Sequence, residues 1–254
     1  MSVLCAVTIT QNEERNITRC LKSVQFADEI VVVDALSKDR TVELAHELGA
    51  RVIHKRWQGF AAQKQFAIDH ATSEWILLID ADEEVTAELA HEISQLLSKP
   101  PMESGFRIRR RNQFLGKWMR HGPWARDFQT RLFRKTNGRI ARRPVHEGVQ
   151  IDGDLGMLQN PLNHFTHQTL AESAQRLNRY TSLEATERVG GRKIRLFDAF
   201  VPPIAVFLRY YLVKGCWKAG VHGFLLASIT AMYKSVLYLK IHFLQRERHV
   251  RESQ

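Results

Sequence analysis

Apolar residues in the first hundred positions come in short runs, each followed by a polar segment. Runs of this length predict buried strands, and they occupy residues 3–9, 29–33, 51–53 and 75–79. Helices are predicted after these runs, over residues 13–24, 40–48, 60–70 and 86–97, and the first has Ile17, Leu21 and Val24 on one face. Strands that alternate with helices of about ten residues predict βαβ units. The pattern therefore predicts an α/β fold with a mostly parallel sheet flanked by helices.

Polar clusters follow three of the predicted strands, at residues 10–14, 34–39 and 80–84. Because the carboxyl ends of parallel strands share one edge of a sheet, we expect these clusters to converge there, where α/β folds bind ligands. Asp80 and Asp82 are two residues apart and could both offer oxygens to one hard divalent cation, which could grip a diphosphate. The alternative is that these acids only begin the helix that follows, since carboxylates favour a helix N-terminus.

No Gly-rich phosphate motif follows the first predicted strand. Both G-x-G-x-x-G and G-x-x-x-x-G-K-[ST] are missing at this position, which argues against a dinucleotide-dependent dehydrogenase and against a P-loop enzyme.

The middle of the chain is strongly basic. Residues 106–143 hold 13 lysines and arginines and one acid, Asp127, in a chain whose net charge is +10. Interleaved aromatic residues would suit a nucleic-acid surface. The same residues would also suit a site for an anionic small molecule or a lipid headgroup, or simply the solvated face of half-buried strands. The charge therefore indicates an anionic partner without identifying it.

Cysteine content and the N-terminal residues bear on the compartment. The three cysteines, Cys5, Cys20 and Cys216, are widely spaced and form no C-x-x-C pattern. This favours a reducing compartment and argues against a disulfide framework or a structural zinc site. The N-terminal residues have the pattern of a strand and lack the basic region of a signal peptide.

The last third of the chain changes character. A polar helix is expected over residues 170–188, and residues 197–244 are apolar and aromatic with scattered lysines and arginines. The longest uncharged run, residues 219–233, is shorter than the roughly 20 residues of a membrane span. Helices of this composition suit the plane of a membrane interface with anionic lipids. The alternative is a helical hairpin that packs on the rest of the chain or on a dimer partner.

Four sequence blocks, in this order and spacing, resemble those of the family 2 glycosyltransferases, which have the GT-A, Rossmann-like fold. The blocks are VTITQNEERNITRCLKSV, VVVDALSKDRT, ILLIDADEE and RRPVHEGV. Within the family, the chain looks most like the lipopolysaccharide inner-core β-1,4-glucosyltransferases that act on heptose. One departure is the second block, where many relatives have a DSGSTDRT-like loop and this chain has Ala35 and Leu36. The exact contacts of that loop are therefore left open.

The resemblance implies an inverting transfer from a UDP-sugar donor with a divalent cation, Mg²⁺ or Mn²⁺. It places donor-binding residues at Thr10, Asn12, Glu13, Asp34, Lys64, Asp80 and Asp82. Of the two aspartates, it implies Asp82 as the direct metal ligand and places Asp80 nearer the ribose. His146 would be a further metal ligand or would orient Glu147. An inverting displacement also needs a base. Glu147 is the first candidate and Asp127 the second.

The resemblance also gives the basic segment a partner, the phosphates and carboxylates of a lipopolysaccharide core. The expected acceptor-binding residues are Arg107, Arg109, Arg110, Arg111, Arg120 and Arg126. Residues 1–165 would be the catalytic domain, with a nucleotide-sugar half (1–98) and an acceptor half (99–165), and residues 166–254 a helical region that is apolar or amphipathic. The expected location is the cytoplasmic face of the inner membrane. A polyprenyl phosphate acceptor, a nucleic-acid-binding protein and a membrane-associated scaffold without chemistry are the alternatives.

Overall fold

The computed structural model describes residues 4–99, 101–141 and 148–252. Contacts divide the chain into two compact units. The first unit comprises residues 1–111 and 127–165, and the second comprises residues 112–126 and 166–254. The assignment of residues 1–165 to a catalytic domain stays a prediction, and residues 112–126 within that range belong to the second unit by their contacts.

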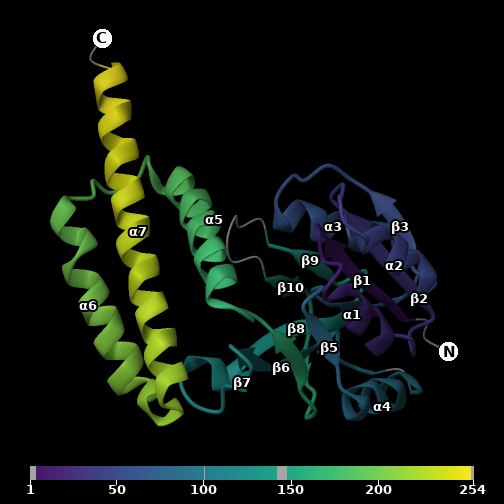
Figure 1. The fold of residues 1–254 in the computed structure, drawn as a ribbon. Coiled ribbons are helices and arrows are strands. Elements are labelled where there is room, and N and C mark those ends of the chain that lie inside the picture. The colour runs from purple at the N-terminus through teal and green to yellow at the C-terminus, as the bar shows by residue number, and fades with distance from the viewer. Residues whose placement is uncertain (1–3, 100, 142–147, 253–254) are drawn as a thin grey trace. The chain divides into compact units, whose positions relative to one another are not determined.

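A mixed sheet forms the centre of the first unit, with strand order β3-β2-β1-β4-β8-β6-β12-β5 (Figure 1). Its parallel half consists of β1 (Leu4–Thr10), β2 (Glu29–Asp34), β3 (Arg51–His54) and β4 (Trp75–Leu78). Its other half contains β5 (Glu83–Val85), β6 (Gly105–Phe114), β8 (Asp127–Arg134) and β12 (Leu162–Phe165). Strand β8 runs antiparallel to both β4 and β6. The predicted α/β class with flanking helices is confirmed, and parallel pairing joins the first four strands of the order.

Short strands complete this description. Strands β7 (Lys117–Trp118) and β11 (Leu155–Met157) both pair with β6. Strands β9 (Gly138–Ile140) and β10 (Val149–Ile151) form a separate antiparallel ribbon.

Helices cover both faces of the sheet in the first unit. They are α1 (Ile17–Ser23), α2 (Thr41–Glu47), α3 (Phe60–His70) and α4 (Ala87–Leu97). Side chains that alternate along the central strands enter two separate apolar clusters: Val32 packs in the cluster with α1, α2 and α4, while Val31 and Val33 pack in the cluster with α3. This burial on both faces is why the central strands have unbroken apolar runs in the sequence.

Two predicted boundaries differ from the structure near the polar clusters. Helix α1 begins at Ile17 instead of residue 13, and a turn precedes it in which the Glu13 carbonyl accepts hydrogen bonds from the N–H groups of Asn16 and Ile17 at 2.9 and 2.8 Å. The acids at residues 80–84 do not form a helix N-terminus. Residues 83–85 form strand β5, and α4 starts only after Thr86, whose hydroxyl accepts a hydrogen bond from the Leu89 N–H at 3.2 Å.

The second unit is mainly helical. Its elements are η1 (Pro123–Arg126), α5 (Leu170–Arg188), η2 (Leu196–Ala199), α6 (Val201–Leu208), the π-helical turn η3 (Arg209–Val213), η4 (Cys216–Ala219) and α7 (Val221–Glu252). Helix α7 packs against α5 on one side and α6 on the other (Figure 1). The helix expected over residues 170–188 is found with those bounds.

Two helical segments of the second unit have the length and apolar composition to cross a membrane, namely Leu196–Val213 and Val221–His249. Only 11% and 22% of their most apolar windows are buried in the structure, so they are not helices of a closed core. Length and composition fit a membrane-spanning helix and a helix in the membrane interface equally well.

Candidate active site

The polar clusters that follow β1 and β2 are joined by hydrogen bonds. The buried carboxylate of Asp34 accepts one from the Thr10 hydroxyl at 3.0 Å and one from the Ser37 N–H at 2.8 Å. The Asn12 N–H donates to the Ser37 hydroxyl at 2.8 Å, and the Glu13 N–H donates to the Thr41 hydroxyl at 2.7 Å. Four of the expected donor-binding residues, Thr10, Asn12, Glu13 and Asp34, therefore belong to one hydrogen-bonded pair of loops. Asp34 holds that pair together from inside the protein.

Leu36 lies in the second of these loops, at the position where a DSGSTDRT-like loop has glycine. Its φ is +59°, in the left-handed region that glycine adopts without strain, and its side chain is half exposed. The backbone of the loop thus has a conformation suited to glycine although the residue has changed.

Asp80 lies between two cations. Its Oδ1 is 2.8 Å from Nζ of Lys64 on α3, and its Oδ2 is 2.5 Å from Nη2 of Arg131 on β8. Arg131 also pairs with the buried Glu83, which in turn accepts a hydrogen bond from the Asp80 N–H at 2.9 Å. Burial alone would raise the pKa of Asp80, but Arg131 and Lys64 outweigh it and hold the pKa well below its usual value. Asp80 therefore remains a carboxylate, and it brings two buried cations to the end of β4.

The network continues to Asp127. Arg110 on β6 places one guanidinium nitrogen 3.2 Å from Glu83 and another 2.7 Å from Asp127. Burial would lower the pKa of Arg110, and Glu83 and Asp127 reverse the effect and raise it. Asp127 also accepts a hydrogen bond from the side-chain amide of Gln129 at 2.9 Å. Taking up a proton would cancel the charge with which Arg110 pairs, so these contacts oppose a role for Asp127 as a base.

Asp82 faces a histidine that the sequence did not single out. Its Oδ2 lies 3.5 Å from Nε2 of His164 on β12, and both side chains are largely buried. The antiparallel pairing of β12 with β5 puts His164 opposite Glu83, and this brings the ring to the D-x-D segment. The motif LNHF gave no signal in the sequence, because a single histidine in a short apolar strand is usually a packing residue and its partner is about 80 positions earlier.

The Asp82 and His164 pair offers one oxygen and one nitrogen donor, a combination that suits Mn²⁺ and leaves further positions for phosphate oxygens or water. Within the described ranges, no group of three or more His, Cys, Asp and Glu side chains could hold a metal ion. His146 and Glu147, the expected additional ligand and the expected base, lie outside the described residues. These two metal-binding side chains therefore fit a cation whose remaining ligands come from the enzyme's substrate.

The expected acceptor-binding arginines fall into three groups. Arg107, Arg109 and Arg111 project from β6 at alternate positions and are exposed, and Nε of Arg111 donates to Asn163 at 2.9 Å. Arg110 instead points to the acids described above, with its side chain 18% exposed. Arg120 and Arg126 are exposed residues of the second unit.

Several known proteins are similar to this chain in sequence. The model of the family "Glycosyl transferase family 2" matches residues 5–151. The lipopolysaccharide core biosynthesis glycosyltransferase LpsC of Rhizobium meliloti is 31% identical over 247 residues, which cover 94% of this chain and 92% of that protein. An uncharacterized glycosyltransferase of Rickettsia felis is 28% identical over 254 residues, covering 95% and 90%.

Among solved structures, a mannosyltransferase from Pyrobaculum calidifontis, in complex with GDP-mannose and Mn²⁺, aligns with a TM-score of 0.50. The alignment covers all of this chain and 88% of that one at 14% identity, so it shows a shared fold only. The match of the family model over more than half of the chain and the similarity to LpsC over nearly its full length lead to one conclusion. The chain belongs to glycosyl transferase family 2.

Proposed function

We propose that this glycosyltransferase transfers a hexose, glucose in the first instance, from a UDP-sugar to a heptose of the lipopolysaccharide inner core with inversion. The observation that carries the proposal is the pairing of Asp82 with His164 beside the Lys64, Asp80 and Arg131 network. Similarity to LpsC, a protein of lipopolysaccharide core biosynthesis, supports the choice of acceptor.

Donor binding would use both parts of this site. Asp82 and His164 would hold a divalent cation, which when bound neutralises the charge that develops on the departing diphosphate. Lys64 and Arg131 would add N–H donors for the diphosphate, while Asp80 and Glu83 compensate their charges. Both are less than a tenth exposed, so water screens their contacts poorly. Asp80 orients these two side chains by accepting from both.

Glu147 would be the base that takes the proton from the attacking hydroxyl. The alternative, Asp127, is held by Arg110 at 2.7 Å and by Gln129 at 2.9 Å, and protonation would disrupt the ion pair. The contacts of Asp127 therefore favour Glu147 for this role and assign Asp127 to the positioning of Arg110.

The exposed arginines of β6 would attract the acceptor. Arg107, Arg109 and Arg111 form a solvated basic row, and guanidinium groups bind phosphates and carboxylates in bidentate fashion. Dephosphorylation of the acceptor would then raise the acceptor KM more than the donor KM.

The second unit would attach the enzyme to the cytoplasmic face of the inner membrane. One face of the segment from η2 to η3 is an exposed apolar stripe, made of Phe197, Phe200, Ile204, Leu208 and Leu212. Two other rings of this segment pack on α7, with the centroids of Phe207 and Tyr211 5.6 and 5.9 Å from that of Phe224. Exposed Arg209, Lys214 and Lys218 flank the stripe, as expected for a helix that lies among anionic headgroups.

The test is transfer by the purified full-length chain. Radiolabelled UDP-glucose, UDP-galactose and GDP-mannose are offered with Mg²⁺ or Mn²⁺ to a heptose-terminated core acceptor, and the product linkage is read by NMR. The proposal predicts metal-dependent transfer from a UDP-hexose with inverted anomeric configuration. Transfer to a polyprenyl phosphate but not to the core acceptor would contradict it, as would nucleic-acid binding without any transfer.

A further inference from the structure

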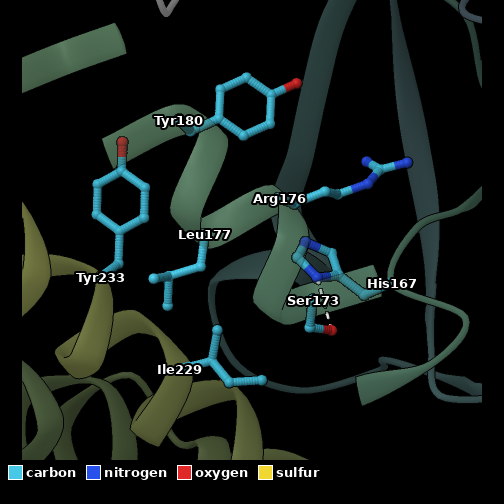
Figure 2. Close-up of a pocket in the computed structure, with 7 residues that line it drawn as sticks. All are labelled: His167, Ser173, Arg176, Leu177, Tyr180, Ile229 and Tyr233. Carbon is cyan, nitrogen blue, oxygen red and sulfur yellow. Dashed lines mark hydrogen bonds between the residues drawn. The ribbon is translucent and has the colours of Figure 1, made fainter. Parts of the chain in front are cut away.

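A partly open cavity of about 140 Å³ lies between α5 and α7 in the second unit (Figure 2). Cavities of about 150 Å³ accommodate a benzene molecule, so the space suits a single six-membered ring. Leu177 and Ile229 form its aliphatic part, and Tyr180 and Tyr233 add two aromatic rings. The size and the rings indicate a ligand with one flat apolar face.

The rest of the lining is polar. His167, Ser173 and Arg176 lie together on one side of the cavity in Figure 2. A purely apolar ligand would take water away from the charged guanidinium of Arg176, which costs free energy even for a paired charge. Arg176 is already paired with Glu172 at 3.1 Å, so the wall offers no uncompensated charge to a phosphate. A neutral ligand with hydroxyl groups matches this combination better than a hydrocarbon or an anion does.

The polar wall is held in place before any ligand binds. His167 adopts a left-handed conformation with φ of +53°, which costs free energy for a residue with a side chain. Its carbonyl accepts a hydrogen bond from the Leu115 N–H at 3.1 Å, and its Nδ1 lies 2.9 Å from the Ser173 hydroxyl. Its ring also packs near Trp124, with centroids 5.8 Å apart. A strained residue that is fixed by several contacts at a cavity points to a binding function.

We propose that this cavity is a second carbohydrate-binding site, which takes one neutral pyranose ring of the acceptor saccharide. A pyranose combines a C–H face, which packs on tyrosine and leucine side chains, with a rim of hydroxyls for His167, Ser173 and Arg176. The inference rests on the proposed function for its choice of saccharide. Binding there would add affinity for the acceptor saccharide.

The experiment measures saccharide binding directly on the full-length chain. A lipid-free, heptose-containing core oligosaccharide and free heptose are titrated by saturation-transfer NMR and calorimetry, and UDP is titrated separately. Tyr180→Ala removes an aromatic wall of the cavity, and Ile229→Phe fills the space from α7. Tyr238→Ala is the matched control, because Tyr238 is also a half-buried tyrosine of this unit but does not line the cavity.

Both cavity variants are expected to raise the oligosaccharide Kd about tenfold and to leave the UDP Kd unchanged. The control should leave both constants unchanged. If the parent binds neither saccharide, or if both variants retain their helical circular dichroism and bind the oligosaccharide like the parent, the proposal is overturned. Failure of the proposed function would appear as absent sugar transfer in the activity assay. The saccharide binding constants decide the role of the cavity separately from that assay.

Discussion

Arg131→Met tests the buried ion network at the end of β4. Arg131 is 5% exposed and contacts both Asp80 and Glu83, so its replacement leaves the buried Glu83 and the partly buried Asp80 each short of a partner. Loss of one member of a buried ion pair typically costs 3–5 kcal/mol. Lys64 still pairs with Asp80 and Arg110 with Glu83, so we expect the low end, about 3 kcal/mol. That free energy corresponds to about 150-fold more opening of the first unit.

Cys20 gives a local assay for this opening. It is fully buried, and its Sγ lies 3.6 Å from the Asp80 carbonyl. The rate of thiol labelling at Cys20, read by mass spectrometry of its peptide, should rise about 150-fold in Arg131→Met at pH 7. Arg139→Met is the matched control, since Arg139 is exposed and makes a single 3.3 Å hydrogen bond to Gln150. Equal labelling of the two variants would refute the reasoning.

The same variant has a predicted pH dependence. The folded pKa of Asp80 lies below its unfolded value, so Asp80 contributes stability that is present above the unfolded pKa, about 3.9, and is lost as the pH falls through the folded pKa. Without Arg131, only Lys64 opposes the effect of burial on the Asp80 carboxyl, so the pKa of Asp80 in the folded state rises. The difference between parent and variant should therefore be largest above about pH 4 and should shrink as the pH falls further, toward the folded pKa of Asp80 in the parent. A constant difference over this range would contradict the assignment of the network.

Three further predictions address the base, the membrane face and the loop after β2. Glu147→Gln should lower turnover about 100-fold with donor binding intact, and near-parental turnover would transfer the role of the base to Asp127. Ile204 is 61% exposed, and Ile204→Asp should abolish sedimentation with anionic vesicles without lowering the melting temperature. Leu183→Asp on α5 is the control and should leave sedimentation unchanged. Equal loss of sedimentation in both variants would refute the apolar stripe as the membrane contact. Leu36→Gly should stabilise the protein by about 1 kcal/mol in urea titrations, because glycine relieves the left-handed strain, and a destabilised variant would contradict that account.

The sequence predicts the first four strands and their helices well, because β1, β2 and β4 have buried apolar runs and α4 has a clear apolar face. It does not predict β5, since Glu83, Glu84 and Val85 have neither signal and become a strand only by pairing with β12, about 80 residues later. The same long-range pairing explains why His164 was missed. Periodicity describes neighbours along the chain, and this contact depends on the closed sheet.

The candidate site shows the same limit. Lys64, Asp80 and Asp82 were identified from a motif and its family resemblance, but the partners of these residues were not. Arg131 is one of many arginines in a basic segment, and nothing in its local sequence distinguishes it from the exposed Arg107 or Arg109. Only the antiparallel pairing of β8 with β4 brings Arg131 to Asp80.

Calorimetric titration of UDP with and without Mn²⁺ tests the metal assignment most directly. The parent should bind UDP at least tenfold more tightly with Mn²⁺, and Asp82→Asn and His164→Ala should each lose that gain while keeping the metal-free affinity. Glu84→Gln is the control, because Glu84 is a carboxylate of the same segment that pairs with Asn163 at 2.8 Å, and it should keep the gain. If Asp82→Asn retains the full effect of Mn²⁺ on UDP binding, the pair formed by Asp82 and His164 does not hold the cation.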